Sequence, residues 1–331
     1  MCQYSSQDGF ASDWHLVHLG SRAVGGAALV VAEATAVEAR GRISPGDLGI
    51  WKDEHVEPLA RIARFVEAQG AVAGIQIAHA GRKASVARPW DGGKSLDDDA
   101  GGWDTVGPSP LAFDAGYRVP TELSAADLSE VRRAFADASQ RALRAGFRYL
   151  ELHAAHGYLL HSFLSPLSNR RSDAYGGSFA NRARLLLEIV RDVRKIWPEG
   201  LVLGVRLSCT DWVEGGWGSY DTVRLSQLLE QEGVDLIDCS SGGNVAKAHI
   251  AVSPGYQVGF AEAVKSGTRL RVAAVGLITE AAQAEAIIAE ERADFVFLAR
   301  EFLRDPYFPR SAARALGHKQ SDVPPQYGRA H

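Results

Sequence analysis

The fold is decided by the stretch Leu201-Val-Leu-Gly-Val-Arg-Leu207 together with the amphipathic segment Thr222–Glu232 and the run Val234-Asp-Leu-Ile-Asp-Cys-Ser240. Two β-branched runs with a helical pattern between them form a strand–helix–strand unit, which joins parallel strands of one sheet. This unit recurs along the chain. The expected strands are Ala27–Glu33, Ala71–Ile77, Arg148–His153, Leu201–Leu207, Val234–Ser240, Leu270–Val275 and Asp294–Ala299. The expected helices are Trp14–Val24, Glu54–Gln69, Ala125–Ala145, Asn181–Trp197, Thr222–Glu232, Tyr256–Ser266, Glu280–Ala289 and Phe302–Leu316.

The helix expected at Trp14 has no strand before it, because only a short polar segment precedes it. We therefore predict an α/β fold of the TIM (β/α)8 barrel type, formed by residues 1–331 as a single domain, with its first strand largely missing from this sequence. A doubly wound open sheet is built from the same units and is the alternative. Such a sheet usually carries Gly-x-Gly-x-x-Gly after its first strand, and no expected strand here is followed by that motif.

The interval between the strands that begin at Ala71 and Arg148 is too long for one connecting helix. Residues 79–121 within it are rich in Gly, Asp and Pro. We expect them to form a capping insertion over the barrel mouth, after the third strand of the complete barrel.

Composition excludes several classes of protein. The 331 residues include 36 Lys and Arg against 40 Asp and Glu, a net charge of −4, which is no electrostatic footprint for nucleic acid. The longest apolar run, Ala23–Ala32, is too short to cross a membrane, and the N-terminus does not resemble a secretory signal. Three cysteines make no disulfide framework. We expect a soluble, cytoplasmic enzyme.

Polar side chains stand where several expected strands end, and the C-terminal strand ends of a barrel share one face. His153 and His156 could bind a metal, donate hydrogen bonds to a substrate oxygen, or be buried histidines with satisfied partners. A metal site needs further His, Asp or Glu ligands at other strand ends. Those ends carry Arg206, Ser240, Gly276 and Arg300, so we predict no metal.

Arg206 and Arg300 allow two interpretations. Each could form an ion pair with a carboxylate, or the two could bind an anionic, phosphorylated cofactor, since guanidinium binds phosphate bidentately. The last two strand ends, at Gly276 and at Ala299-Arg300, correspond to the usual phosphate site of phosphate-binding barrels. A Schiff-base aldolase would need a lysine on a strand, and none of the seven lysines lies on an expected strand.

Several longer motifs identify a family. The chain contains Met1-Cys-Gln-Tyr4, Glu33-Ala-Thr-Ala-Val37, Gly74-Ile-Gln-Ile-Ala-His-Ala-Gly-Arg-Lys-Ala84, His153-Ala-Ala-His-Gly-Tyr158, Leu164-Ser-Pro-Leu-Ser-Asn-Arg-Arg-Ser-Asp-Ala-Tyr-Gly-Gly177 and Ala274-Val-Gly-Leu-Ile278. Together these resemble the Old Yellow Enzyme family, in its thermophilic-like subclass of NADPH dehydrogenases and xenobiotic reductases. The resemblance extends from residue 1 to the C-terminus.

The resemblance implies an FMN-binding barrel that uses NADPH to reduce the C=C bond of α,β-unsaturated carbonyl compounds and related activated alkenes, by a ping-pong mechanism. Ala34, Gln76 and Arg206 would contact the flavin ring, and Cys2 would lie near it. The FMN phosphate would be held by Gly276, Ala299 and Arg300. The subclass usually has Gly where Ala299 stands, and we expect the extra methyl group to be tolerated.

For the substrate, the resemblance implies that His153 and His156 bind the carbonyl oxygen and that Tyr158 donates a proton. Tyr4 and Lys83 would line the substrate pocket. Arg329, in Gln326-Tyr-Gly-Arg329, would reach the active site of a neighbouring subunit, which implies a homodimer or a dimer-based homotetramer.

The chain departs from the family at its beginning, because family members carry a barrel-floor hairpin and the first strand before the position of Met1. A barrel lacking one strand has two unpaired edges. We therefore expect a start-site artefact, or a shortened chain that loses flavin readily. The alternative function is an N-terminally truncated, catalytically impaired flavin-binding homologue. A dienoyl-CoA reductase type with an iron–sulfur cluster is excluded, because Cys2, Cys209 and Cys239 are not closely spaced.

Overall fold

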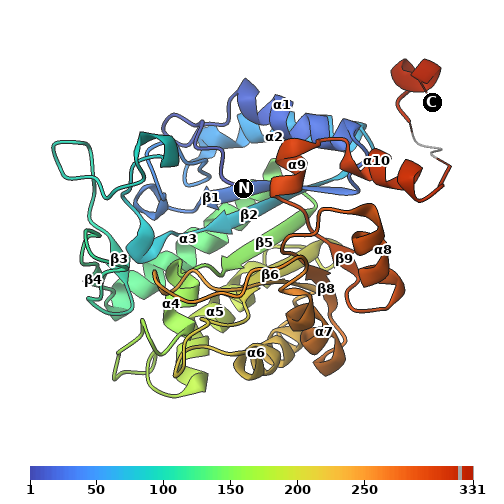
Figure 1. Ribbon diagram of the computed structural model, residues 1–331. Coiled ribbons are helices and arrows are strands. Elements are labelled where there is room, and N and C mark those ends of the chain that lie inside the picture. Colours follow the sequence, from blue (N-terminus) through green and yellow to red (C-terminus); the bar gives the residue numbers. More distant parts are fainter. Residues whose placement is uncertain (320–322, 331) are drawn as a thin grey trace.

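A curled, all-parallel sheet forms the centre of the computed structural model, which describes residues 1–319 and 323–330 (Figure 1). Its hydrogen-bonded order is β1-β2-β5-β6-β7-β8-β9. The strands are β1 (Leu29–Ala36), β2 (Val72–Ala78), β5 (Tyr149–Ala154), β6 (Val202–Ser208), β7 (Leu236–Ser240), β8 (Arg271–Ala274) and β9 (Phe295–Val296). All six neighbouring pairs are parallel, as strands joined by helical crossovers must be.

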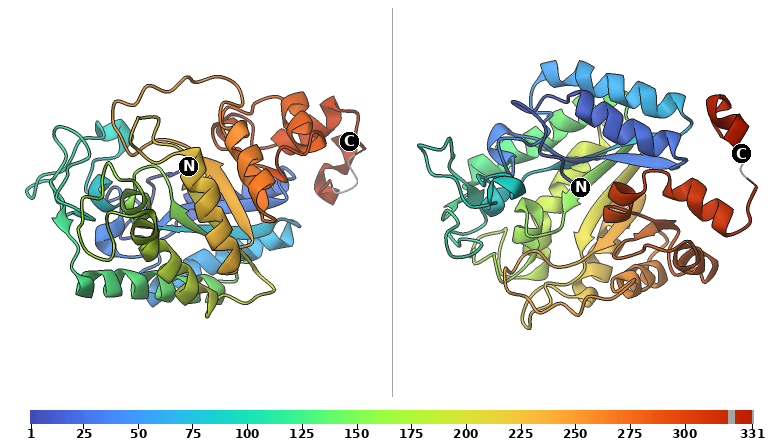
Figure 2. Two further views of the ribbon diagram at one scale, coloured as in Figure 1. Left: turned by 90° about the horizontal axis from the view of Figure 1, so that it is seen from below. Right: turned by 45° about the horizontal axis from the view of Figure 1, so that its top comes forward.

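Most helices cover the outer, convex side of the sheet, as the views in Figure 2 show, whereas α9 lines the cavity described below. The helices are α1 (Asp13–Val24), α2 (Val56–Ala68), α3 (Ala125–Arg144), α4 (Leu159–Leu164), α5 (Phe179–Arg194), α6 (Ser219–Gln231), α7 (Val258–Gly267), α8 (Ala281–Ala289), α9 (Arg300–Arg304) and α10 (Phe308–Ala315). The inner face of α3 shows why they pack there: Leu128, Val131, Phe135, Ala138 and Ala142 recur at helical spacing and are all buried.

The α/β architecture predicted from the repeated strand–helix units is confirmed, and each of the seven expected strands is present within a few residues of its expected bounds. The sheet curls into a half-barrel whose described strands begin at β1 and end at β9. A strand that would close the barrel between these two edges stays a prediction.

One expected helix is wrong, and one observed helix was not predicted. The helix expected over 302–316 is two helices, α9 and α10, because Pro306 lacks a backbone N–H and disfavours helical geometry at Asp305 before it. The short helix α4, directly after the motif that ends at Tyr158, was not expected. Its six residues are all buried and show no amphipathic pattern, so periodicity gives no signal for it.

The segment 79–121 has little regular structure. It contains the 3-10 turns η3 (Gly81–Lys83) and η4 (Pro89–Asp91) and leads into a small parallel pair of strands, β3 (Val106–Gly107) with β4 (Thr121–Glu122). This segment lies beside the C-terminal end of β2 in Figure 1. Among the described residues, no helix is both long and apolar enough to span a membrane.

Candidate active site

A cavity of about 480 Å³ extends along β1 and reaches the C-terminal ends of the neighbouring strands, and its size is typical of sites for cofactors and small molecules. It is lined by the N-terminal segment, by α1 and α9, by β1, β2, β5, β6, β7 and β9, and by the segments that follow β5, β8 and β9. Nine of the residues predicted from the sequence line it: Cys2, Tyr4, Ala34, Gln76, His153, His156, Tyr158, Arg206 and Ala299.

Strand register brings the polar residues of the cavity floor together. Gln76 of β2 is opposite Glu151 of β5, and Gln76 Nε2 donates a hydrogen bond of 2.6 Å to Glu151 Oε1. The hydroxyl of Tyr149 donates to the other oxygen of Glu151 at 2.5 Å. The amide of Gln76 is therefore held in one orientation, with its carbonyl oxygen directed away from Glu151.

Arg206 has a carboxylate partner on the next strand. It is opposite Asp238 of β7, and its Nε lies 2.9 Å from Asp238 Oδ2 in an ion pair. Burial lowers the pKa of Arg206, but Asp238 and Glu151 more than offset this effect, so the pKa stays above its usual value. Burial raises the pKa of Asp238, although Arg206 opposes that shift. The ion-pair interpretation of Arg206 is thus correct for the described residues, and its side chain still lines the cavity.

The hydrogen-bond partners of His153 and His156 fix which ring nitrogens carry hydrogen. Ala155 N–H donates to His153 Nδ1 at 3.2 Å, so the hydrogen of a neutral His153 is on Nε2. That nitrogen is 3.3 Å from His156 Nδ1, which acts as the acceptor. His156 then carries its hydrogen on Nε2, 2.7 Å from Ser240 Oγ. A directed chain of donors runs from His153 through His156 to Ser240.

Both imidazoles are neutral at ordinary pH. Burial is the main cause that holds the pKa of each far below its usual value, and the positive charge of Arg206 adds to it. The rings of His153 and His156 are nearly perpendicular, with centroids 5.0 Å apart. The ring of Tyr158 lies 4.9 Å from that of His153. Burial raises the pKa of Tyr158, so its phenol keeps its proton.

The N-terminal segment contributes Cys2 and Tyr4 to the cavity wall. The carboxylate of Glu33 ties this segment to β1, because Gln3 N–H donates to Glu33 Oε1 at 2.8 Å. Burial raises the pKa of Glu33 to about 7. Burial, with Glu33 and Asp47 nearby, also raises the pKa of the Cys2 thiol, so this cysteine is not an activated thiolate.

Four predicted residues do not line the cavity: Lys83, Gly276, Arg300 and Arg329. Lys83 Nζ donates to the carbonyl oxygens of His156 and Gly243, both at 2.9 Å, and burial lowers its pKa to about 8. Gly276 follows Val275, which does line the cavity, and Arg300 is the first residue of α9 after Ala299. Arg329 is exposed on the 3-10 turn η5 (Pro325–Ala330), and this C-terminal turn lies apart from the rest of the chain in Figure 1.

Sequence reasoning missed Glu33, Glu151 and Asp238 as members of the site, and it placed Ser240 at a strand end without giving it a role. The available signal was the one that pointed to Arg206, namely a charged residue inside a buried apolar strand, as in Tyr149-Leu-Glu-Leu and Leu236-Ile-Asp-Cys. Within residues 1–319 and 323–330, no group of three or more His, Cys, Asp or Glu side chains could hold a metal ion.

Comparison with known proteins gives a consistent result. Residues 1–319 match the model of the NADH:flavin oxidoreductase / NADH oxidase family. The NADPH dehydrogenase of Geobacillus sp. (strain WCH70) is 48% identical over 319 residues, which cover 96% of this chain and 88% of the relative. The structure of morphinone reductase in complex with tetrahydroNAD superposes with a TM-score of 0.79 at 25% identity, over 98% of this chain and 87% of that one. The Old Yellow Enzyme homologue from Zymomonas mobilis has the same fold, with a TM-score of 0.77 at 22% identity over 96% of this chain and 87% of that chain.

Proposed function

Because the chain belongs to the NADH:flavin oxidoreductase / NADH oxidase family, we propose that it is an ene-reductase, which reduces the C=C bond of activated alkenes with electrons from NADPH. It is a flavin oxidoreductase of the Old Yellow Enzyme type, with FMN as cofactor and NADPH as electron donor. The family inferred from the sequence motifs is confirmed. The reaction and the roles of individual residues are the proposal.

The residues of the cavity fit FMN. The volume of the cavity is sufficient for a tricyclic ring system. Asp238 Oδ1 is buried and has no hydrogen-bond partner among the described residues. Buried polar atoms are normally paired, so a polar ring edge at the cavity floor would satisfy it. FMN held by these residues would supply the hydride-transfer chemistry between NADPH and the alkene.

Gln76 and Arg206 would hold the flavin ring, and Ala34 and Cys2 would pack against it. Since Asp238 and Glu151 keep Arg206 charged, its guanidinium would stabilise negative charge on the ring. The phosphate would be bound by Gly276, Ala299 and Arg300. Of these three residues, Ala299 lines the cavity, which supports a phosphate at the end of the cavity next to β9.

His153 and His156 would bind the carbonyl oxygen of the substrate. Both rings are neutral and carry one hydrogen each, on Nε2. In the structure the His153 N–H is directed at His156 Nδ1, and the His156 N–H is directed at Ser240 Oγ. A carbonyl oxygen that replaces His156 Nδ1 and Ser240 Oγ as acceptor would receive two hydrogen bonds. Such bonds draw electrons from the conjugated alkene and make its β-carbon a better hydride acceptor.

Tyr158 would donate the proton to the α-carbon. Its raised pKa keeps the phenol protonated until a strong base, such as a carbon with carbanion character, takes the proton. Tyr4 would line the substrate pocket, while Lys83 would act through the turn that it holds. The observation that carries the proposal is that two neutral imidazoles and a phenol stand on one wall of a cavity whose floor presents Gln76 and Arg206.

The experiment is anaerobic stopped-flow of the purified flavoprotein. NADPH should bleach the flavin, and 2-cyclohexenone should restore its absorbance. Tyr158→Phe should slow the second step at least about 100-fold and leave the first nearly unchanged. His153→Ala should raise the KM for the enone. Bleaching by NADPH without any reoxidation by alkenes would instead favour the catalytically impaired flavin-binding homologue.

The remaining parts of the proposal concern the oligomeric state, the domain boundaries and the location of the protein. Arg329 would complete the active site of a second subunit, in a homodimer or a dimer-based homotetramer, and its exposed position on η5 supports this role. Residues 1–331 would form one domain, with 79–121 as a cap at the cavity mouth. A strand between β9 and β1 would close the barrel, and the protein would act in the cytoplasm.

A further inference from the structure

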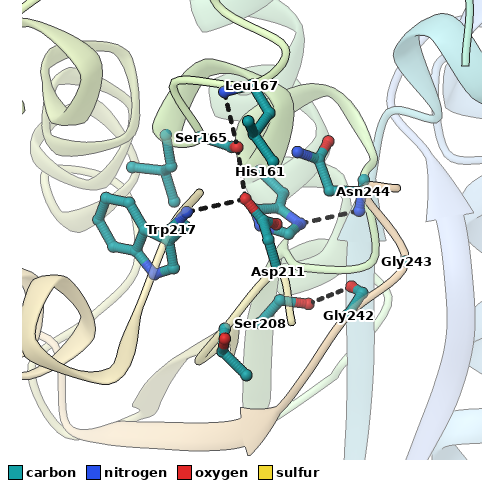
Figure 3. A network of polar contacts seen from close by, with 12 residues as sticks. His161, Ser165, Leu167, Ser208, Asp211, Trp217, Gly242, Gly243 and Asn244 are labelled. Carbon is teal, nitrogen blue, oxygen red and sulfur yellow. Dashed lines mark hydrogen bonds and ion pairs between the residues drawn. The ribbon is translucent and has the colours of Figure 1, made fainter. Parts of the chain in front are cut away.

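A buried polar network, drawn in Figure 3, bonds to the turn formed by residues 156–158, which we call the catalytic turn, and its two central residues do not line the cavity. Its centre is the pair His161 and Asp211, neither of which is exposed to solvent. His161 belongs to α4, and Asp211 belongs to the loop between β6 and α6. No role of the site described above uses either residue.

The turn that carries the proposed catalytic groups has an unusual backbone. His156 and Gly157 both have positive φ, of 60° and 74°. A left-handed conformation at a non-glycine residue costs free energy and persists only where the surroundings hold it. The next residue is Tyr158, so the angles at 156 and 157 set the positions of both the imidazole and the phenol.

Each backbone N–H of this turn has one partner. His156 N–H donates to Ser208 Oγ at 2.9 Å, and Ser208 Oγ donates in turn to the carbonyl of Gly242. Gly157 N–H donates to His161 Nδ1 at 2.9 Å. The imidazole of His161 is thus the hydrogen-bond acceptor that holds the second left-handed residue.

That hydrogen bond dictates the tautomer of His161. Since Nδ1 accepts from Gly157, the ring is neutral and its hydrogen is on Nε2. Nε2 lies 3.1 Å from Asp211 Oδ1, at an angle less favourable than that of a regular hydrogen bond. A carboxylate at this place accepts hydrogen and cannot donate it, so it favours the tautomer that Gly157 requires.

Asp211 is itself fixed. Its Oδ2 accepts from Ser165 Oγ at 2.5 Å and from Trp217 N–H at 2.9 Å. Although burial raises the pKa of Asp211, the contacts with His161, Ser165 and Trp217 outweigh it and keep the pKa below its usual value. The carboxylate therefore stays ionised, with Oδ1 directed at His161.

From this geometry we propose that His161 and Asp211 are positioning residues for alkene reduction: Asp211 selects the tautomer of His161, whose Nδ1 holds the turn that places His156 and Tyr158. The inference rests on the proposed function, since it assigns these two residues to the same site. Neither residue lines the cavity.

The proposal makes opposite predictions for two asparagine variants. In Asp211→Asn, the amide oxygen stays with its two donors, Ser165 and Trp217, so the NH2 group faces His161 Nε2–H. Two donors then oppose each other, and either the ring moves or it adopts the tautomer with hydrogen on Nδ1, which cannot accept from Gly157. In His161→Asn, by contrast, Oδ1 occupies nearly the place of Nδ1 and still accepts from Gly157.

The test measures flavin reoxidation by 2-cyclohexenone, the KM for the enone, flavin content and the thermal midpoint of the flavoprotein. Asp211→Asn and His161→Leu should slow reoxidation at least about 10-fold, because a small displacement of reacting groups is costly. His161→Asn should restore most of the rate. The matched control is His55→Leu, which removes a buried imidazole that bonds to the carbonyl of Asp8, outside the cavity.

The inference is overturned if Asp211→Asn reoxidises as fast as the His55→Leu control, or if His161→Asn is as slow as Asp211→Asn at an equal thermal midpoint. These two asparagine variants decide the matter if His161→Leu does not fold. If the wild-type flavoprotein fails to reduce alkenes, the proposed function fails by itself. Hydrogen exchange of the Gly157 amide then tests the network: it should accelerate in Asp211→Asn and not in His161→Asn.

Discussion

Gly157→Ala tests the idea that the catalytic turn packs backbone against backbone. A Cβ at position 157 would lie 2.3 Å from the carbonyl oxygen of Gly243 and 2.8 Å from the Cα of Asn244. Both contacts are with the main chain of the loop after β7, which cannot rotate away as a side chain could. The turn and this loop would have to separate.

The magnitude follows from two contributions. At φ +74°, alanine costs about 1–2 kcal/mol of backbone strain. The forced separation adds about 1–3 kcal/mol, as overpacking in a dense interior does. Gly146→Ala is the matched control, because Gly146 has φ +90° and no atom within 4 Å of a Cβ placed there. That variant should show the strain contribution alone.

The assay compares thermal midpoints and enone-dependent NADPH oxidation of the two variants. Each kcal/mol lost from the free energy of unfolding should lower the thermal midpoint by about 2 °C. Gly157→Ala should therefore unfold several degrees below Gly146→Ala, and its turnover should fall by about 100-fold because His156 and Tyr158 move with the turn. Equal midpoints together with equal turnover in the two variants would refute the close packing of the turn against the β7 loop.

Three further outcomes follow from burial. Glu33 has a folded-state pKa raised to about 7 from 4.5, so the stability it contributes is complete below pH 4.5 and is lost as the pH rises through 7. Glu33→Gln should remove this loss of stability, which amounts to about 3 kcal/mol. The thermal midpoints of the wild type and the variant should therefore diverge as the pH rises from 4.5 to 8. Parallel curves would contradict the raised pKa of Glu33. Phe135→Ala, in the fully buried face of α3, should cost about 3–5 kcal/mol in denaturant unfolding and leave the KM for the enone unchanged. Lys83→Met should leave the carbonyls of His156 and Gly243 without their hydrogen-bond donor. We expect slower flavin reoxidation at normal flavin content. An unchanged rate would show that the lysine is dispensable.

Much of the architecture could be predicted locally. The β-branched runs at 201–207 and 234–240 became β6 and β7, because buried parallel strands need continuous apolar sequence. The pattern Ser124-x-x-Asp127 is typical of a helix start, and α3 begins there: Ser124 N–H donates to Asp127 Oδ2 and Asp127 N–H donates to Ser124 Oγ. The polar residues at strand ends gathered at one cavity for a simple reason: parallel strands all end on the same side.

The periodicity of the local sequence was not sufficient to predict two features of the helices. The helix α4 has no polar face and so no periodicity, and it forms because tertiary packing buries it on every side. The continuous apolar pattern of 302–316 favours one helix, but Pro306 disfavours helical geometry at the residue before it and separates α9 from α10.

The sequence by itself determined which chemical groups this protein has: two imidazoles and a phenol in one motif, an amide and a guanidinium on two strands, and a parallel sheet to carry them. Only the tertiary structure decided how they are paired. Arg206 meets Asp238, Gln76 meets Glu151, and His161 meets Asp211 through strand register and loop contacts between residues far apart in the chain. Charge state and tautomer depend on those partners and on burial, and neither is a property of local sequence.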